Sequence, residues 1–139
     1  MADNLSKQLR SKVMRAIRSK NTKPELTVRK LIFSLGYFYR LKRPRLPGRP
    51  DLIFAPRRKV IFVHGCFWHV HTNCAIAHIP KYPFWREKLK TNKARDAAAI
   101  KALNKAGWST LVIWECELKN SRWVRERLIE FLGPRSFRR

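Results

Sequence analysis

Acidic residues are scarce in this chain of 139 residues. It has 9 Asp and Glu against 32 Lys and Arg, which gives a formal net charge of +23. Self-repulsion of this size favours a polyanion partner, and nucleic acid is the commonest one. The charge could instead serve only to keep the surface solvated, or to bind an anionic membrane. The sequence contains no basic helix with an aromatic face that would support membrane binding.

Long apolar runs are also missing, and none approaches the roughly 18 residues of a membrane span. The N-terminus lacks the charged and apolar regions of a signal peptide, so the cytoplasm is the expected compartment. The chain has only three cysteines, which cannot pair completely, so a metal site is favoured over a disulfide framework. The length predicts a single domain over residues 1–139.

Hydrophobic periodicity predicts an α/β order of elements. Helices are expected over residues 5–19, from Thr22 to the stop at Gly36, and over 84–106 and 123–132; strands are expected over 37–41, 51–55, 60–64 and 109–115. The helix between the last two strands implies a crossover connection, hence a central mixed sheet flanked by helices. Its near-continuous apolar run makes the strand at 109–115 the expected central one. Residues 1–20 are expected to form a basic helical arm, and 134–139 a flexible tail.

The turn at residues 56–59 predicts a hairpin between the strands at 51–55 and 60–64. If the hairpin is symmetric about that turn, Asp51 lies opposite His64. Directly opposed residues share a face, with Cβ atoms about 5 Å apart. This register therefore places a carboxylate beside an imidazole at one end of the sheet.

All four histidines and two of the three cysteines lie between His64 and His78. Thiolates and imidazoles are ligands that zinc prefers. The pattern predicts a structural zinc site, although His69 or His78 can replace the histidine of the set. The four expected ligands are Cys66, His71, Cys74 and Cys116.

Asp51, His64, His69 and Asp96 form a candidate hydrolytic group. A carboxylate at a strand end can hold Mg²⁺, and a neutral histidine can take a proton from water. Asp96 and Asn92 fall on the apolar face of the helix at 84–106. Because a buried carboxylate needs a partner, Asp96 is expected to bond a specific group, with orientation of a histidine as its candidate role.

Two sets of residues have structural explanations as well as functional ones. Phe67, Trp68 and Trp85 either pack in the core or stack on bases. Glu25 stands where a capping box places its acid after Thr22, which explains it without catalysis.

Separated motifs, in the same order, resemble the very-short-patch repair (Vsr-type) DNA mismatch endonucleases, from about residue 11 to residue 118. The motifs are Met14-Arg-Ala-Ile-Arg, Thr22-Lys-Pro-Glu25, Leu46-Pro-Gly-Arg-Pro-Asp51-Leu-Ile-Phe, Phe62-Val-His64-Gly-Cys66-Phe-Trp-His69, Phe84-Trp85 with Lys88, Asn92 with Arg95-Asp96, and Gly107-Trp108 before Val112-Ile-Trp-Glu-Cys116. The resemblance implies a restriction-endonuclease-like fold. It also implies an enzyme that nicks one strand of duplex DNA at a G·T mismatch left by deamination of 5-methylcytosine.

The same resemblance implies roles for the candidate residues. Asp51 would bind Mg²⁺ together with the backbone carbonyl of Val63. His69 would be the general base, oriented by Asp96, and His64 would contact the scissile phosphate.

Supporting roles follow from the resemblance too. Glu25 would reach the metal through water, and Asn92 would support that network. The zinc would be held by the four ligands named above. The side chains expected to insert beside the mismatch are Met14, Phe67, Trp68 and Trp85.

Three rival functions stay open at this point: an endonuclease of the same fold with restriction-type specificity, a DNA-binding module that does not cut, and a zinc-stabilised RNA-binding protein. The chain is expected to act as a monomer. The DNA sequence recognised around the mismatch does not follow from the amino-acid sequence, because base contacts depend on side-chain placement.

Overall fold

The computed structural model describes residues 22–40, 46–66, 69 and 83–134. The expected N-terminal arm and the tail after residue 134 lie outside the described residues. The same is true of six candidate side chains: Met14, Phe67, Trp68, His71, Cys74 and the alternative zinc ligand His78. No helix in the described ranges is long and apolar enough to cross a membrane.

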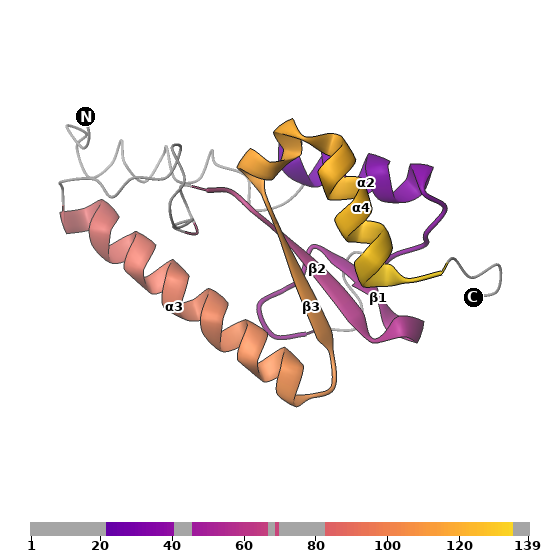
Figure 1. Cartoon of the computed structure of the whole chain (residues 1–139). Coiled ribbons are helices and arrows are strands. Elements are labelled where there is room, and N and C mark those ends of the chain that lie inside the picture. The colour runs from indigo at the N-terminus through magenta and orange to yellow at the C-terminus, as the bar shows by residue number, and fades with distance from the viewer. Residues whose placement is uncertain (1–21, 41–45, 67–68, 70–82, 135–139) are drawn as a thin grey trace.

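A three-stranded sheet forms the centre, with helices on both of its faces (Figure 1). Helix α3 lies on one face, and α2 and α4 lie together on the other. The elements are α2 (Lys23–Ser34), β1 (Leu52–Phe54), β2 (Lys59–His64), α3 (Pro83–Lys105), β3 (Ser109–Trp114) and α4 (Ser121–Leu132), with 3-10 turns at Ala55–Arg57 and Glu115–Lys119.

Strand β2 pairs antiparallel with β1 and parallel with β3, so the sheet is mixed, as expected. The parallel pair is joined through α3, which supplies the predicted crossover. The sheet order is β1-β2-β3, so the expectation that residues 109–115 form the central strand is wrong for the described sheet. Strand β2 is central because it has a hydrogen-bonded neighbour on each side, and five of its six residues are buried. In β3 only Ile113 is buried.

Alternation along the strands separates two apolar layers. Ile61 and Val63 face α2 and α4, where Ile32 and Leu128 cover them. The alternate residues of the strands face α3 and form a smaller cluster with residues in and after that helix. Its members are Ile53, Val60, Phe62, Leu103 and Trp108. Strand β2 therefore contributes to both layers, which explains its near-complete burial.

Local signals set the helix ends. The Thr22 side chain accepts a hydrogen bond from the backbone N–H of Glu25 at 3.4 Å, and Gly36 follows α2 with φ of 88°. Helix α3 matches the expected range to within one residue at each end. Helix α4 begins two residues earlier than expected, capped by Asn120 and followed by Gly133.

The expected strand at residues 37–41 is not present within its described part, 37–40. Arg40 forms a single isolated antiparallel bridge with Ile53. The segment turns inward instead, because buried Tyr37 donates a hydrogen bond to the Gly133 carbonyl at 2.5 Å. Within residues 37–40, backbone pairing with β1 is therefore limited to Arg40.

The predicted hairpin forms, but its register is shifted. The structure pairs Leu52 with Ile61 and Phe54 with Lys59, so Asp51 is not opposite His64. The partner of each β1 residue is displaced by two positions, which preserves the faces and changes the neighbours.

The turn itself explains this shift. Residues 55–57 form a 3-10 turn, in which Arg58 N–H donates to the Ala55 carbonyl at 3.0 Å. Ala55 therefore belongs to the turn, and Lys59 belongs to the strand. A symmetric hairpin about residues 56–59 had assigned both residues the other way.

Three consecutive cations at the end of this turn and the start of β2 bind helix C-termini. Arg57 donates to the Leu132 carbonyl at 2.7 Å and Lys59 to the Phe131 carbonyl at 2.5 Å, both at the end of α4. Arg58 donates to the Ala106 carbonyl, just after α3. Cations near the last carbonyls satisfy them and interact favourably with the helix dipole. Part of the large positive charge therefore stabilises the fold.

The loop before β1 makes a close contact with α3. Gly48 has φ of 75°, and a Cβ atom built on it would lie 2.5 Å from the Cβ of Ala99. That separation is too short for any side chain. Glycine at this position lets the loop that leads to Asp51 lie directly against the helix that carries Asp96.

We expect Gly48→Ala to destabilise the protein more than Gly107→Ala does. Both glycines have positive φ, so alanine pays a backbone cost at each, but a Cβ at Gly107 meets nothing nearer than an ordinary 3.5 Å contact. The overlap at Gly48 adds about 1–3 kcal/mol. Urea unfolding of the two variants measures the difference, and equal losses would contradict the close-contact account.

Candidate active site

Asp51 is fixed at the point where the chain enters β1. Its backbone N–H donates to the Ile61 carbonyl at 3.1 Å, and its carboxylate accepts from the Val63 N–H at 2.6 Å. Both contacts are made to β2, the central strand. The carboxylate is therefore held against the end of the central strand rather than left in a mobile loop.

Glu25 brings a second carboxylate to this place from the first turn of α2. It is 4% exposed and forms an ion pair with Arg29 at 3.3 Å, one helical turn further on. Glu25 also hydrogen-bonds to the Asp51 side chain. The cap position explains where Glu25 lies in the sequence, but its side chain points to the site.

Burial raises the pKa of Asp51 to about 8, from an ordinary 3.8. The Val63 N–H opposes this rise, Glu25 adds to it by hydrogen bond and charge, and the Arg29 charge lowers it. Two carboxylates that lie close together and partly out of water disfavour ionisation unless a cation joins them. Oxygen ligands of this kind suit Mg²⁺, so the residues present fit the expected ion.

His69 and Asp96 form the second half of the site. The Nδ1 atom of His69 lies 2.5 Å from the Asp96 carboxylate, which α3 presents. The His69 backbone is held by a 3.2 Å hydrogen bond from its N–H to the Gly65 carbonyl. The prediction that Asp96 bonds a specific group is confirmed. A proton on Nδ1 satisfies the contact and leaves Nε2 free to accept another proton.

His64 ends β2 and lies against His69. The two rings stack with centroids 3.9 Å apart and planes 7° apart, and Trp114 meets His64 edge-on at 5.1 Å. Burial lowers the pKa of His64 from 6.5 to about 4; the neighbouring His69 lowers it further and Asp96 opposes this. Its Nδ1 is buried, and no described atom hydrogen-bonds to it. His64 is therefore a neutral imidazole at ordinary pH.

His64, His69 and Asp96 bring possible ligand atoms within 4.8 Å of one another, so they form a candidate metal site. The stack argues against it. Ring nitrogen lone pairs lie in the ring planes, so two parallel rings 3.9 Å apart cannot both point at one ion about 2 Å from each nitrogen. The group is better described as a histidine oriented by a carboxylate, with a second imidazole beside it.

The two halves meet through consecutive residues of β2. Val63 holds the Asp51 carboxylate, and His64 is the next residue. Asp51 and His64 were expected to be linked by direct cross-strand pairing. They are linked instead through the backbone N–H of Val63, the residue before His64.

Two of the four expected zinc ligands lie together. Cys66 is buried, and its Sγ accepts a hydrogen bond from the Cys116 N–H at 3.4 Å. Glu115 accepts from the Cys66 N–H at 3.3 Å, which ties the segment after β2 to the turn after β3. The other two expected ligands, His71 and Cys74, lie outside the described residues.

Helix α3 carries the remaining described candidates. Asn92 is half-buried, one turn before Asp96. Trp85 is half-buried and contacts Phe84 edge-to-face, with ring centroids 5.0 Å apart. The partial burial of Asn92 agrees with its expected place on the apolar face of this helix.

Sequence reasoning missed Arg29 and Trp114 as parts of the site. Arg29 had a readable signal, because Glu25 and Arg29 are spaced for an ion pair across one helical turn. Trp114 had none, since its contact with His64 depends on the parallel register of β2 and β3.

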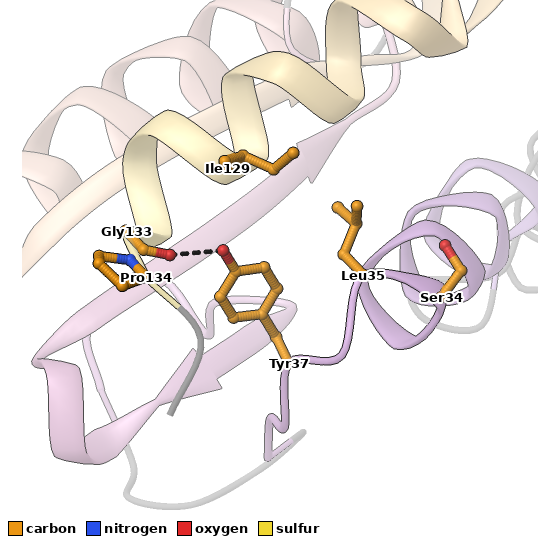
Figure 2. Close-up of a pocket in the computed structure, with 6 residues that line it drawn as sticks. All are labelled: Ser34, Leu35, Tyr37, Ile129, Gly133 and Pro134. Carbon is orange, nitrogen blue, oxygen red and sulfur yellow. Dashed lines mark hydrogen bonds between the residues drawn. The ribbon is translucent and has the colours of Figure 1, made fainter. Parts of the chain in front are cut away.

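An open groove of about 620 Å³ lies at the ends of α2 and α4, where Figure 2 shows the Tyr37 hydroxyl bonded to Gly133. No candidate catalytic residue lines it. Its lining is Ser34, Leu35, Tyr37, Ile129, Gly133 and Pro134.

Comparison with known proteins gives a consistent result. The sequence profile described as DNA mismatch endonuclease Vsr matches residues 2–75. The type II nicking enzyme V.XorIIP of Xanthomonas oryzae pv. oryzae is 46% identical over 136 residues, which cover 96% of this chain and 99% of that protein. V.NmeAIP of Neisseria meningitidis serogroup A is 45% identical, covering 92% of each chain. The DNA mismatch endonuclease Vsr of Escherichia coli is 41% identical, covering 94% of this chain and 81% of that one.

The raised pKa of Asp51 predicts a pH-dependent loss of stability without divalent cations. The unfolded carboxyl ionises above about 3.8 and the folded one only near 8, so its stabilising contribution is present at low pH and is lost as pH rises toward 8. The variant Asp51→Asn is the reference for this test, because its amide cannot ionise and still offers an oxygen to the Val63 N–H.

Without added Mg²⁺, raising the pH from 5 to 8 should lower the unfolding free energy of the wild type by on the order of 1–3 kcal/mol relative to Asp51→Asn, because only the wild type has a carboxyl that must ionise at this position. Urea titrations at the two pH values measure this. A constant difference between the two proteins would show that Asp51 is not destabilised by its surroundings.

Proposed function

The chain belongs to the Vsr family of DNA mismatch endonucleases and is a DNA endonuclease; from this we propose that it nicks one strand of duplex DNA at a G·T mismatch, by Mg²⁺-dependent phosphodiester hydrolysis. The mismatch is the one left when 5-methylcytosine deaminates. The observation that carries the proposal is the junction at Val63 and His64, where buried carboxylates meet a histidine oriented by Asp96.

Asp51 would hold Mg²⁺ directly, with the Val63 backbone carbonyl as a second ligand and Glu25 acting through water. Bound Mg²⁺ supplies positive charge that neutralises the phosphate and favours attack at phosphorus. The buried pair of carboxylates supports this assignment, because a cation relieves the repulsion that raises the pKa of Asp51.

His69 acts as the general base in this proposal. Its Nε2 atom takes the proton of the attacking water, while Asp96 holds the ring and stabilises the imidazolium that forms. Because it is neutral, His64 can donate one hydrogen bond to the scissile phosphate without competing for the proton. Asn92 would keep the end of the network near Asp96 in place.

Duplex DNA is the proposed substrate form. The net charge of +23 suits a polyanion, and the relatives carry the names nicking enzyme and DNA mismatch endonuclease. The chain would act as a cytoplasmic monomer, in a restriction-endonuclease-like fold. The proposed wedge beside the mismatch consists of Met14, Phe67, Trp68 and Trp85.

A structural zinc would complete the domain. The contact between the Cys116 backbone N–H and the Cys66 Sγ supports it, since it brings two cysteines from separated segments close together. His71 and Cys74 would supply the other two ligands. Such a zinc would brace the segment between His64 and His69 without touching the phosphate.

We expect Asp51→Asn to lower nicking of a G·T duplex by roughly 100-fold or more, because the metal loses its direct ligand. The matched control is Glu126→Gln, which removes an exposed carboxylate whose one ion-pair partner among the described residues is Arg122 on the same helix. Both variants should keep the wild-type zinc content, which metal analysis can measure alongside nicking.

Substrate choice is measured in the same assay with G·T and fully paired duplexes. Preference for the mismatch supports the proposal. Equal cleavage of the paired duplex would favour a restriction-type enzyme, and binding without cleavage in Mg²⁺ would favour a non-cutting module.

A further inference from the structure

Two non-glycine residues among those described have positive φ, and both are arginines. Arg49 has φ of 49° and Arg58 has φ of 57°. The left-handed conformation costs an L-residue with a Cβ atom about 1–2 kcal/mol. Such a cost persists only where the surrounding structure imposes it, and this occurs often at functional sites.

The fold accounts for Arg58. Its guanidinium donates to the Ala106 carbonyl at 3.1 Å and lies 4.7 Å above the centre of the Trp108 ring. Its backbone N–H closes the turn between β1 and β2. The strained backbone is therefore offset by contacts of the same residue.

Arg49 has no comparable contacts. Its backbone N–H donates to the Leu46 carbonyl at 3.2 Å, but its side chain is exposed and makes no hydrogen bond, ion pair or ring contact with the described chain. The residues on either side are anchored: Gly48 lies against Ala99, and Pro50 is buried. The fold thus holds a guanidinium outward from a fixed backbone.

The backbone that carries this guanidinium lies close to the carboxylate proposed to bind the metal. Arg49 is two residues before Asp51, so their Cα atoms are at most about 7 Å apart. Asp51 is itself fixed to β2 through the Val63 N–H. A phosphate bound next to Asp51 is within reach of an arginine side chain at this position.

We propose that Arg49 is a DNA-binding residue that contacts a backbone phosphate adjacent to the scissile bond. The inference rests on the proposed role of Asp51 at the cleavage site. The planar guanidinium can donate two parallel hydrogen bonds to one phosphate, which fixes the orientation of the strand as well as attracting it. The rigid loop keeps this donor in place before DNA arrives, which lowers the ordering cost of binding.

Arg49→Gly and Arg58→Gly form a matched pair for the test. Glycine relieves the backbone strain at both positions and removes one positive charge from each. Three quantities are measured: the melting temperature without added Mg²⁺, the salt dependence of duplex binding, and the single-turnover nicking rate in Mg²⁺.

For Arg49→Gly we expect an unchanged or higher melting temperature, nicking slowed about tenfold or more, and a plot of log binding constant against log salt that is shallower by about one. For Arg58→Gly we expect a lower melting temperature, with the salt slope and the nicking rate of the folded protein unchanged. Arg49→Lys should keep the salt slope and recover only part of the rate, because an ammonium cannot make the paired hydrogen bonds.

The inference is overturned if Arg49→Gly has the wild-type salt slope and rate, or if its loss of rate comes with a lower melting temperature and an unchanged slope. The proposed function is tested separately. If Asp51→Asn abolishes nicking while Arg49→Gly behaves as wild type, only the role of Arg49 is wrong. If the wild type nicks no duplex, the proposed function fails, and the salt slope still decides whether Arg49 contacts DNA.

Discussion

The hydrogen bond from the Val63 N–H to the Asp51 carboxylate is the interaction on which the layout of the site depends. It fixes the acid at the end of the central strand, and it makes His64, the next residue, a neighbour of that acid. His64 in turn stacks on His69, which Asp96 holds from α3. Contacts from β1, β2 and α3 therefore form one continuous chain, and moving β2 by two residues would break it at its first link.

Local patterns explain which features could be predicted from the sequence. The ends of α2 and α3 follow from caps, glycines and periodicity, and the need of Asp96 for a partner follows from its position on the apolar face of α3. The hairpin register could not be derived, because it depends on whether Ala55 belongs to the strand or to the turn. Pairing across the whole sheet decides this, and no local sequence signal does. The central position of β2 depends likewise on pairing between distant segments, which a run of apolar residues in β3 does not reveal.

Positive charge has several separate uses in this molecule. Arg57 and Lys59 satisfy the last carbonyls of α4, and Arg29 lies among the buried carboxylates as their internal counter-ion. Arg49, two residues before Asp51, is exposed and has no such task among the described residues. The composition gives a single large net charge, and only the contacts separate the cations that hold the fold from those available to a phosphate.

The central claim is that the Asp51 half and the His69 half act as one catalytic centre. A double-mutant cycle tests this most directly: single-turnover nicking of a G·T duplex by Asp51→Asn, His69→Ala and the double variant at saturating enzyme. Groups that act on one transition state lose their effects non-additively, so the double variant should be no more than a few-fold slower than the slower single variant. If the two losses multiply in full, the halves contribute independently and the account of a single centre joined through Val63 and His64 is wrong.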